Sequence, residues 1–392
     1  MISAKYQAML HRRSAIMELS AFAWQRAQEI GAENVFDFSL GNPCVPTPKE
    51  YNERIIALLQ NEPRIHAYSP DLGLREAREK IAASLNRRFG MHYDADDLVM
   101  TAGAAGALAY AIRLVTSPGD EILTFAPFFP EYTPYTELAG RKLQVVPARL
   151  SDFQIDFAAL ETRMNPRVQA VLVNTPCNPS GVVYSHETLK TLCDFLSRKE
   201  KEYGHEIWLI SDEPYREILF DGHVQPYVSV YYARTLSCYS FSKSLSVPGD
   251  RVGYLAINPA CGHSKMLARM AVQVSRGIGH DSTAGIVQRA AADCCEMTAD
   301  FSVYERNMNL LYNELTQLGF EIVRPGGTFY MFPKAPEDDA AAFCRKAAQH
   351  DLILVPGDTF GVPGYFRIAY CIEEEKVKRS LEKWRTLIKT TY

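Results

Sequence analysis

Three stretches of sequence decide the fold: VQAVLVNTPCNPSG at residues 168–181, IWLISDEPY at 207–215 and LSCYSFSK at 236–243. The first two begin with a mostly apolar run, the third begins with the strand-like LSCYS, and all three end in polar loop residues. Continuous rather than alternating apolar runs are typical of strands in a parallel sheet that is covered on both faces. The three stretches therefore predict buried strands of such a sheet, with polar side chains at their carboxyl ends.

Further strands are expected at residues 98–100, 121–125 and 252–257, and helical spacing marks residues 186–201. Strands that alternate with helices predict an α/β fold, here a large domain with a mostly parallel, seven-stranded-type sheet between helices. After one or two long helices at 283–318, the strand-like GGTFYMFP, a helix at 338–350, a strand at 366–370 and a last helix from 373 predict a smaller α+β domain. The expected division is an N-terminal segment at 1–44 that packs on the site and the small domain, a large domain at 45–285 and a small C-terminal domain at 286–392.

Composition excludes several classes of protein. The 392 residues are 47% apolar, and 42 Lys and Arg against 46 Asp and Glu give a net charge of −4, which excludes intrinsic disorder and argues against a nucleic-acid partner. No stretch approaches the ~20 apolar residues of a membrane helix, and the N-terminus lacks the pattern of a signal peptide. The nine cysteines show no metal-binding spacing, so we expect no metal, free thiols and a cytoplasmic location.

Two charged residues lie just beyond predicted strands. Lys243 follows LSCYS among the hydroxyls of Ser240 and Ser242, and Arg251 comes eight residues later. A lysine at such a strand end can form a Schiff base when desolvation or a nearby positive charge lowers its pKa, but a surface lysine on a serine-rich loop fits equally well. Asp212 lies at the end of the preceding predicted strand, in the stretch at 207–215, where a carboxylate can hold a protonated ring nitrogen or simply cap a turn.

Four more segments have both a chemical and a structural interpretation. TAGAAGA at 101–107 places small residues at a helix start, where an anion binds well, although tight packing needs the same residues. APFFPEY at 126–132 offers an aromatic ring for stacking on a cofactor or for the core. NTPCNPSG contains Asn178 in an ordinary turn sequence. FRIAYC buries Arg367, which needs either a substrate carboxylate or an internal acidic partner.

The order of these segments resembles that of the class I and II pyridoxal-phosphate aminotransferases of fold type I. The resemblance extends from SLGNP at 39–43 to FRIAYC at 366–371. It implies that Lys243 forms the internal aldimine and moves the Cα proton, and that Asp212 pairs with the pyridine nitrogen. Asn178 and Tyr215 would bind the phenolic oxygen. Phe129 would stack on the ring, and Arg367, with Gly41 and Asn178, would bind the substrate carboxylate. The implied phosphate contacts are Gly103, Ala104, Ala105, Ser240, Ser242, Arg251 and, from the neighbouring subunit, Tyr68.

The implied activity is transfer of an amino group from an α-amino acid to a 2-oxo acid, with ping-pong kinetics, in a homodimer with shared active sites. A carbon–sulfur β-lyase on the same scaffold is the alternative, because it would use the same lysine, aspartate and arginine. A non-catalytic domain that binds the cofactor is a third reading, which the short segment before the large domain disfavours.

The sequence leaves the substrate side chain open. Ala105 stands where similar aspartate aminotransferases have a lysine, whereas Arg276 and His280 lie near a region that supplies an arginine in others. Residues 12–24 are expected to pack over the site and to contact the substrate.

Overall fold

The computed structural model describes residues 2–3, 6–7, 9, 15–280 and 282–391. Its centre is a seven-stranded sheet with the strand order β2-β8-β7-β6-β5-β3-β4. Strand β8 pairs antiparallel with both of its neighbours, and the other pairings are parallel. The strands are β2 (Leu98–Thr101), β3 (Glu121–Phe125), β4 (Lys142–Val146), β5 (Val168–Asn174), β6 (Trp208–Asp212), β7 (Thr235–Ser240) and β8 (Gly253–Ile257). The predicted mostly parallel sheet is confirmed.

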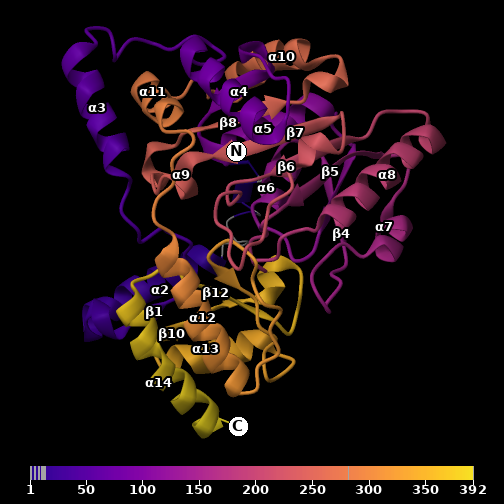
Figure 1. Ribbon diagram of the computed structural model, residues 1–392. Coiled ribbons are helices and arrows are strands. Elements are labelled where there is room, and N and C mark those ends of the chain that lie inside the picture. The colour runs from indigo at the N-terminus through magenta and orange to yellow at the C-terminus, as the bar shows by residue number, and fades with distance from the viewer. Residues whose placement is uncertain (1, 4–5, 8, 10–14, 281, 392) are drawn as a thin grey trace.

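Helices cover both faces of this sheet (Figure 1). Helices α5 (Gly103–Val115), α6 (Tyr132–Leu138) and α10 (Ser264–Gly277) share one apolar cluster with the strands, and α7 (Phe157–Arg163) and α8 (His186–Tyr203) share another. A third cluster joins α3 (Lys49–Asn61), α4 (Arg75–Phe89) and α11 (Gly285–Asp293) to β7 and β8. This burial on both sides explains why the central strands β5 and β6 are mostly apolar in sequence.

Local sequence sets the ends of the helices. The Oγ of Ser185 accepts a hydrogen bond from the Thr188 amide and caps the start of α8, while Gly204, in the left-handed conformation at φ 74°, ends it. The sequence prediction of 186–201 is therefore confirmed to within two residues. The short helices are η1 (Ala32–Asn34), η2 (Ala95–Asp97), η3 (Val228–Val230), α9 (Phe241–Ser244), η4 (Pro248–Asp250), η5 (Pro259–Cys261) and η6 (Gly357–Phe360).

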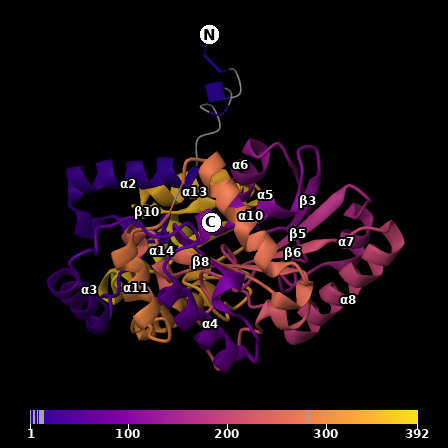
Figure 2. The same ribbon diagram turned by 90° about the horizontal axis from the view of Figure 1, so that it is seen from above.

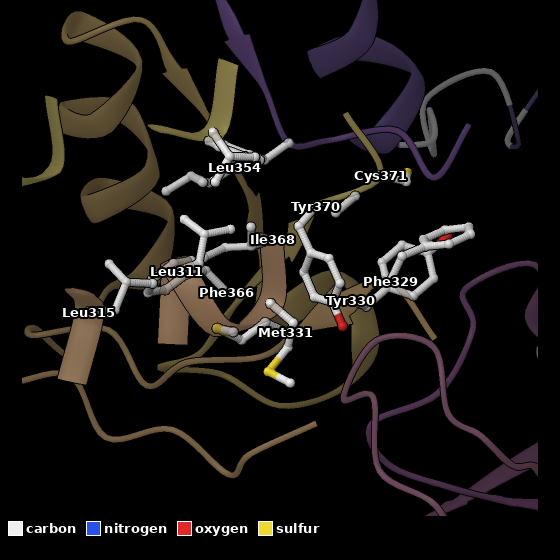
Figure 3. Close-up of a cluster of buried hydrophobic side chains, with 14 of the residues drawn as sticks. Leu311, Leu315, Phe329, Tyr330, Met331, Leu354, Phe366, Ile368, Tyr370 and Cys371 are labelled. Carbon is white, nitrogen blue, oxygen red and sulfur yellow. The ribbon is translucent and has the colours of Figure 1, made fainter. Parts of the chain in front are cut away.

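A second, smaller body is built from both ends of the chain, as Figures 1 and 2 show. Strand β1 (Phe36–Asp37) pairs in parallel with β10 (Leu352–Ile353), and β9 (Tyr330–Met331), β12 (Phe366–Ala369) and β11 (Val355–Pro356) form an antiparallel sheet. Around them lie α2 (Ala15–Ile30), α12 (Ser302–Gln317), α13 (Ala340–Gln349) and α14 (Glu374–Thr391). Figure 3 shows the apolar core in which Leu311, Met331 and Ile368 meet.

The boundaries 1–44, 45–285 and 286–392 stay a prediction. Helix α11, which the last boundary assigns almost entirely to the small domain, packs against α3 and α4 beside the large sheet. None of the helices in the described ranges combines the length and apolar character needed to cross a membrane.

Candidate active site

A cavity of about 320 Å³ opens at the carboxyl ends of β5, β6 and β7, where the larger body meets the smaller one. Open parallel sheets bind their ligands at this edge, because the loops that follow the strands converge there. Most of the residues predicted from the sequence line this one cavity. They are Gly41, Ala104, Ala105, Phe129, Asn178, Asp212, Tyr215, Ser240, Ser242, Lys243, Arg251 and Arg367.

Lys243 lies on the single turn of α9, three residues after β7 ends. Its Nζ donates a hydrogen bond of 2.7 Å to the carbonyl oxygen of Gly41. Burial lowers the pKa of the ammonium group to about 8; the thiol of Cys371 opposes this, and the positive charges of Arg251 and Arg367 add to it. Roughly a tenth of this amine is therefore unprotonated at pH 7, far more than for an ordinary lysine, and this form can act as a nucleophile or a base.

Asp212 is the last residue of β6 and is buried at 4% exposure. The hydroxyl of Tyr132 donates a 2.6 Å hydrogen bond to Oδ2, whereas Oδ1 has no partner within the part of the chain that the structure describes. Burial raises the pKa of the carboxyl group to about 7, although the Tyr132 hydrogen bond works against the rise. Asn174 donates from Nδ2 to the Asp212 carbonyl oxygen at 2.9 Å and fixes the backbone. Asp212 is thus a buried carboxyl group to which no described residue offers a positive partner.

One end of the cavity is formed to hold an anion. Helix α5 begins at Gly103, whose φ of +72° favours glycine, and a Cβ there would lie 3.0 Å from Arg251 Nη2 and 3.2 Å from Ser240 Oγ. The hydroxyls of Ser240 and Ser242 lie 2.7 Å apart. The guanidinium of Arg251 reaches the Ala102 carbonyl oxygen at 3.2 Å. The free amides of the α5 N-terminus, two hydroxyls and one guanidinium therefore face a common space.

Arg367 forms the other end of the cavity and is buried at 1% exposure. Its Nη1 donates a 3.0 Å hydrogen bond to Asn178 Oδ1, and Nη2 donates to the carbonyl oxygen of Ser39. Its Nε has no partner, and no ion pair joins Arg367 to a carboxylate among the described residues. Burial lowers the pKa of the guanidinium. Among the described residues Arg367 therefore has no acidic side-chain partner, which was one of the two alternatives that the sequence left open. The guanidinium is available to the carboxylate of a bound substrate.

Tyr330 lines the cavity and was missed by the sequence analysis. Its hydroxyl lies 3.1 Å from the Tyr215 hydroxyl, and its ring centre is 4.6 Å from the Arg367 guanidinium carbon. A Cβ at Gly41 would fall 1.8 Å from the Tyr330 hydroxyl, so Gly41 must remain glycine. Burial raises the pKa of Tyr330 to about 12, which keeps the phenol neutral. Only the fold brings residue 330 to this place, because the GGTFYMFP segment itself carries no signal of a site.

Other predicted residues lie elsewhere or make structural contacts. Tyr68 is fully exposed and does not line the cavity of its own chain. Arg276 is exposed at the end of α10 and bonds to Gln273, while His280 Nδ1 lies 2.9 Å from the Tyr110 hydroxyl. Of the segment predicted to cover the site, residues 12–14 lie outside the described residues. Ile16 from that segment lines the cavity.

Comparison with known proteins identifies the family. The family model described as aminotransferase class I and II matches residues 33–383. An aspartate aminotransferase of Thermotoga maritima is 31% identical, covering 94% of this chain and 95% of that protein. An aspartate/prephenate aminotransferase of Thermus thermophilus is 29% identical over 99% of this chain and 98% of its own length.

Solved structures agree with the sequence relatives. The crystal structure of an amino transferase from Eubacterium rectale has a TM-score of 0.96 and 43% identity, with 100% of this chain and 99% of that chain covered. The structure of Thermus thermophilus aspartate aminotransferase with maleate has a TM-score of 0.87 and 27% identity, with 99% of each chain covered. Nothing in these comparisons favours a β-lyase. The chain therefore belongs to the class I and II aminotransferases, and it is a transaminase that uses pyridoxal phosphate.

Proposed function

We propose that Lys243 is the residue through which this transaminase holds pyridoxal phosphate and moves a proton at the substrate's Cα. The observation that carries the proposal is that its Nζ shares one cavity with Asp212, Arg251 and Arg367. The lowered pKa of about 8 supplies the unprotonated amine that both tasks require. The amine therefore lies in the same cavity as a buried carboxyl group, an anion site and a guanidinium that has no carboxylate partner among the described residues.

The residues present fit the cofactor. When bound, pyridoxal phosphate supplies an aldehyde that condenses with amines and a ring that draws electrons from the substrate's Cα. The buried Oδ1 of Asp212 has no partner within the described residues, and a protonated ring nitrogen would provide the missing donor and positive charge. Phe129 lines the same cavity and would stack on the ring.

The two ends of the cavity would hold the two anionic groups. Gly103, Ala104, Ala105, Ser240, Ser242 and Arg251 would bind the phosphate at the start of α5. The Asn178 amide already accepts from Arg367 through Oδ1, so its Nδ2 would donate to the phenolic oxygen together with the Tyr215 hydroxyl. Each of these polar groups of the cavity wall would thus form a hydrogen bond with an oxygen of the cofactor.

Arg367 would bind the α-carboxylate of the amino acid and of the 2-oxo acid. A buried guanidinium without a carboxylate partner among the described residues is costly unless an anion pairs with it. Gly41 contributes its backbone beside this place, and its carbonyl oxygen already receives the Lys243 hydrogen bond. The substrate's carboxylate would thus be bound at a point that brings Cα toward the Lys243 amine, which then accepts the Cα proton.

We further infer a homodimer with shared sites. Tyr68 is fully exposed in a single chain, which supports a role in a neighbouring subunit, where its hydroxyl would reach the phosphate. We also place the protein in the cytoplasm, because all nine cysteines are free thiols and a reducing compartment preserves them. The N-terminal segment at 1–44 would cover the site, and Ile16 at the cavity wall supports this role.

The proposed roles are tested by following the visible absorbance of the bound cofactor when an amino acid is added without an acceptor. The spectrum should change once per active site, and an added 2-oxo acid should restore it, as ping-pong kinetics require. The Lys243→Ala variant should still bind the cofactor but should lose turnover. A variant that turns over like the parent protein would refute the role of Lys243. Release of pyruvate and ammonia from cystathionine would indicate the lyase instead.

A further inference from the structure

The segment at residues 37–41 leads from strand β1 of the smaller body to the cavity. Its backbone contacts both of the cations that the proposed function places beside the substrate. The carbonyl oxygen of Ser39 accepts a hydrogen bond from Arg367 Nη2, and that of Gly41 accepts one from Lys243 Nζ at 2.7 Å. The segment is therefore a structural link between the guanidinium that would bind the α-carboxylate and the reacting amine.

Asp37 fixes the backbone at the start of this segment. Its Oδ1 accepts two hydrogen bonds from Ser39, one from the backbone amide at 2.9 Å and one from the hydroxyl at 2.6 Å. A bond from an aspartate to the amide two residues later forms an Asx-turn, which fixes the local backbone. Ser39 is buried at 0% exposure, so water does not compete for its hydroxyl. Asp37 thereby determines where the Ser39 carbonyl group points.

Backbone pairing holds the segment only up to the residue before Ser39. Phe38 donates from its amide to the Ile353 carbonyl oxygen of β10 at 3.0 Å, and its own carbonyl oxygen accepts from the Ala369 amide of β12 at 2.8 Å. Ala369 lies two residues after Arg367 on the same strand. Beyond Phe38, the described residues show the carboxylate of Asp37 as the acceptor that continues this support.

The guanidinium of Arg367 depends on the Ser39 carbonyl group for its orientation. The rings of Tyr330 and Phe360 lie 4.6 and 4.9 Å from the guanidinium carbon and contact it without hydrogen bonds. Among the described residues, the hydrogen-bond acceptors are Asn178 Oδ1 at 3.0 Å and the Ser39 carbonyl oxygen. These two acceptors set the rotation of the planar group, and a two-bond pair with a carboxylate requires the correct rotation.

We infer that Asp37 is a positioning residue for the substrate's α-carboxylate, and that it acts through Ser39 on Arg367. This inference rests on the proposed function, because it assumes that Arg367 binds the α-carboxylate. Burial raises the pKa of Asp37, and the charge of Arg367 opposes this rise, so the two groups also interact through space. The contacts to Ser39 carry the effect, because they fix the carbonyl group that the guanidinium touches. A neutral variant that keeps these contacts separates them from the charge.

The test compares amino acids with the amines that lack their α-carboxylate in the first half-reaction of the holoenzyme. Stopped-flow absorbance follows the cofactor spectrum with aspartate, leucine and phenylalanine, and with β-alanine, isopentylamine and 2-phenylethylamine. Asp37→Ala removes both bonds to Ser39. The half-saturating concentration of the best amino acid should rise about tenfold, with its limiting rate and the rate of the matching amine changed less than about threefold. A purely structural role would affect the amino acid and the amine alike.

Three further variants define the cause. Asp37→Asn keeps an oxygen that can accept both bonds, so the half-saturating concentration should change less than about twofold. Ser39→Ala removes the hydroxyl bond alone and should raise this concentration about fourfold. Asp351→Asn is the matched control, because it removes a carboxylate of the smaller body that bonds to Arg26 and Lys383 instead. It should lower stability and leave the half-saturating concentration unchanged.

The outcomes separate this inference from the proposed function. An Asp37→Ala protein that binds the amino acid like the parent, or that loses the amino acid and its amine equally, overturns the inference while leaving transamination intact. An Asp37→Asn protein with the full tenfold effect also overturns it, because the charge would then be the cause. If Asp37→Ala does not fold, unchanged binding in Ser39→Ala overturns it. If no amino acid changes the spectrum of the parent, the proposed function fails, and the inference fails with it.

Discussion

Replacing Asp212 by asparagine should stabilise the cofactor-free protein and weaken its binding of the cofactor. The carboxyl group has an ordinary pKa of 3.8, and burial raises its pKa to about 7 in the folded chain. One pKa unit corresponds to about 1.4 kcal/mol, so at pH 8 the buried charge costs the folded state about 4 kcal/mol. Asparagine keeps the shape and can still accept the Tyr132 hydrogen bond, but it carries no charge.

The direction of this pH dependence follows from the protonation of Asp212 in the folded and in the unfolded chain. Between pH 4 and 7 the folded carboxyl group keeps the proton that the unfolded chain releases, so the folded state loses stability as the pH rises through this interval. The advantage of Asp212→Asn over the parent should therefore be small near pH 4 and should grow to about 4 kcal/mol above pH 7.

Urea unfolding of the cofactor-free proteins from pH 4 to 9 measures this difference, and a cofactor titration measures the opposite effect on binding. Glu217→Gln is the matched control, because Arg216 and Arg88 overcome the effect of burial and lower the pKa of Glu217. That variant should lose stability at neutral pH. An Asp212→Asn protein that is less stable than the parent at pH 8, or whose advantage does not depend on pH, would refute the reasoning.

Three further predictions follow from the contacts of the site. Arg367→Ala should raise KM for amino acids by about 100-fold or more, because it removes a charge-assisted pair, yet should barely affect amines that lack a carboxylate; equal effects in steady-state assays would contradict its role. Tyr330→Phe keeps the ring over Arg367, so KM should change less than about threefold. The variant loses the hydroxyl contact to Tyr215, so the pH dependence of the cofactor spectrum should shift, and an unchanged pH dependence would argue against that contact. Burial lowers the pKa of Lys243 from 10.5 to about 8, so between these pH values the unfolded chain holds a proton that the folded chain has released, and the free energy of unfolding rises with pH. Lys243→Met should remove up to about 3 kcal/mol of this rise in urea unfolding, and an unchanged pH dependence would refute the lowered pKa.

The sequence predicted the sheet and the loops of the site because buried parallel strands carry a strong local signal. Strands β5 and β6 are mostly apolar, β7 is buried along its whole length, and the polar ends of the three strands hold Asn174, Asp212 and Ser240. Strand β4 was missed because it forms the edge of the sheet, with Lys142 exposed and its next three residues only half-buried. The pairing of β1 with β10 joins two residues with two others more than three hundred positions away, and no local pattern reveals such a contact.

The candidate site shows the same limit of prediction from local sequence. The residues that were predicted from their own motifs, such as Lys243 and Arg367, line the cavity. The partners that set their chemistry come from distant segments: Tyr132 bonds to Asp212 across 80 residues, and Tyr330 bonds to Tyr215 across 115. Whether Arg367 meets an acidic side chain was undecidable from the sequence, because that question depends on packing alone.

The most direct test of the central claim is chemical trapping. Borohydride reduction of the holoenzyme, followed by digestion and peptide mass mapping, locates the residue that carries the cofactor. We predict that the added mass lies on Lys243 in SFSKSLSV, residues 240–247, and that Lys243→Ala abolishes it. Attachment to any other lysine, or no covalent attachment in the parent protein, would contradict the account.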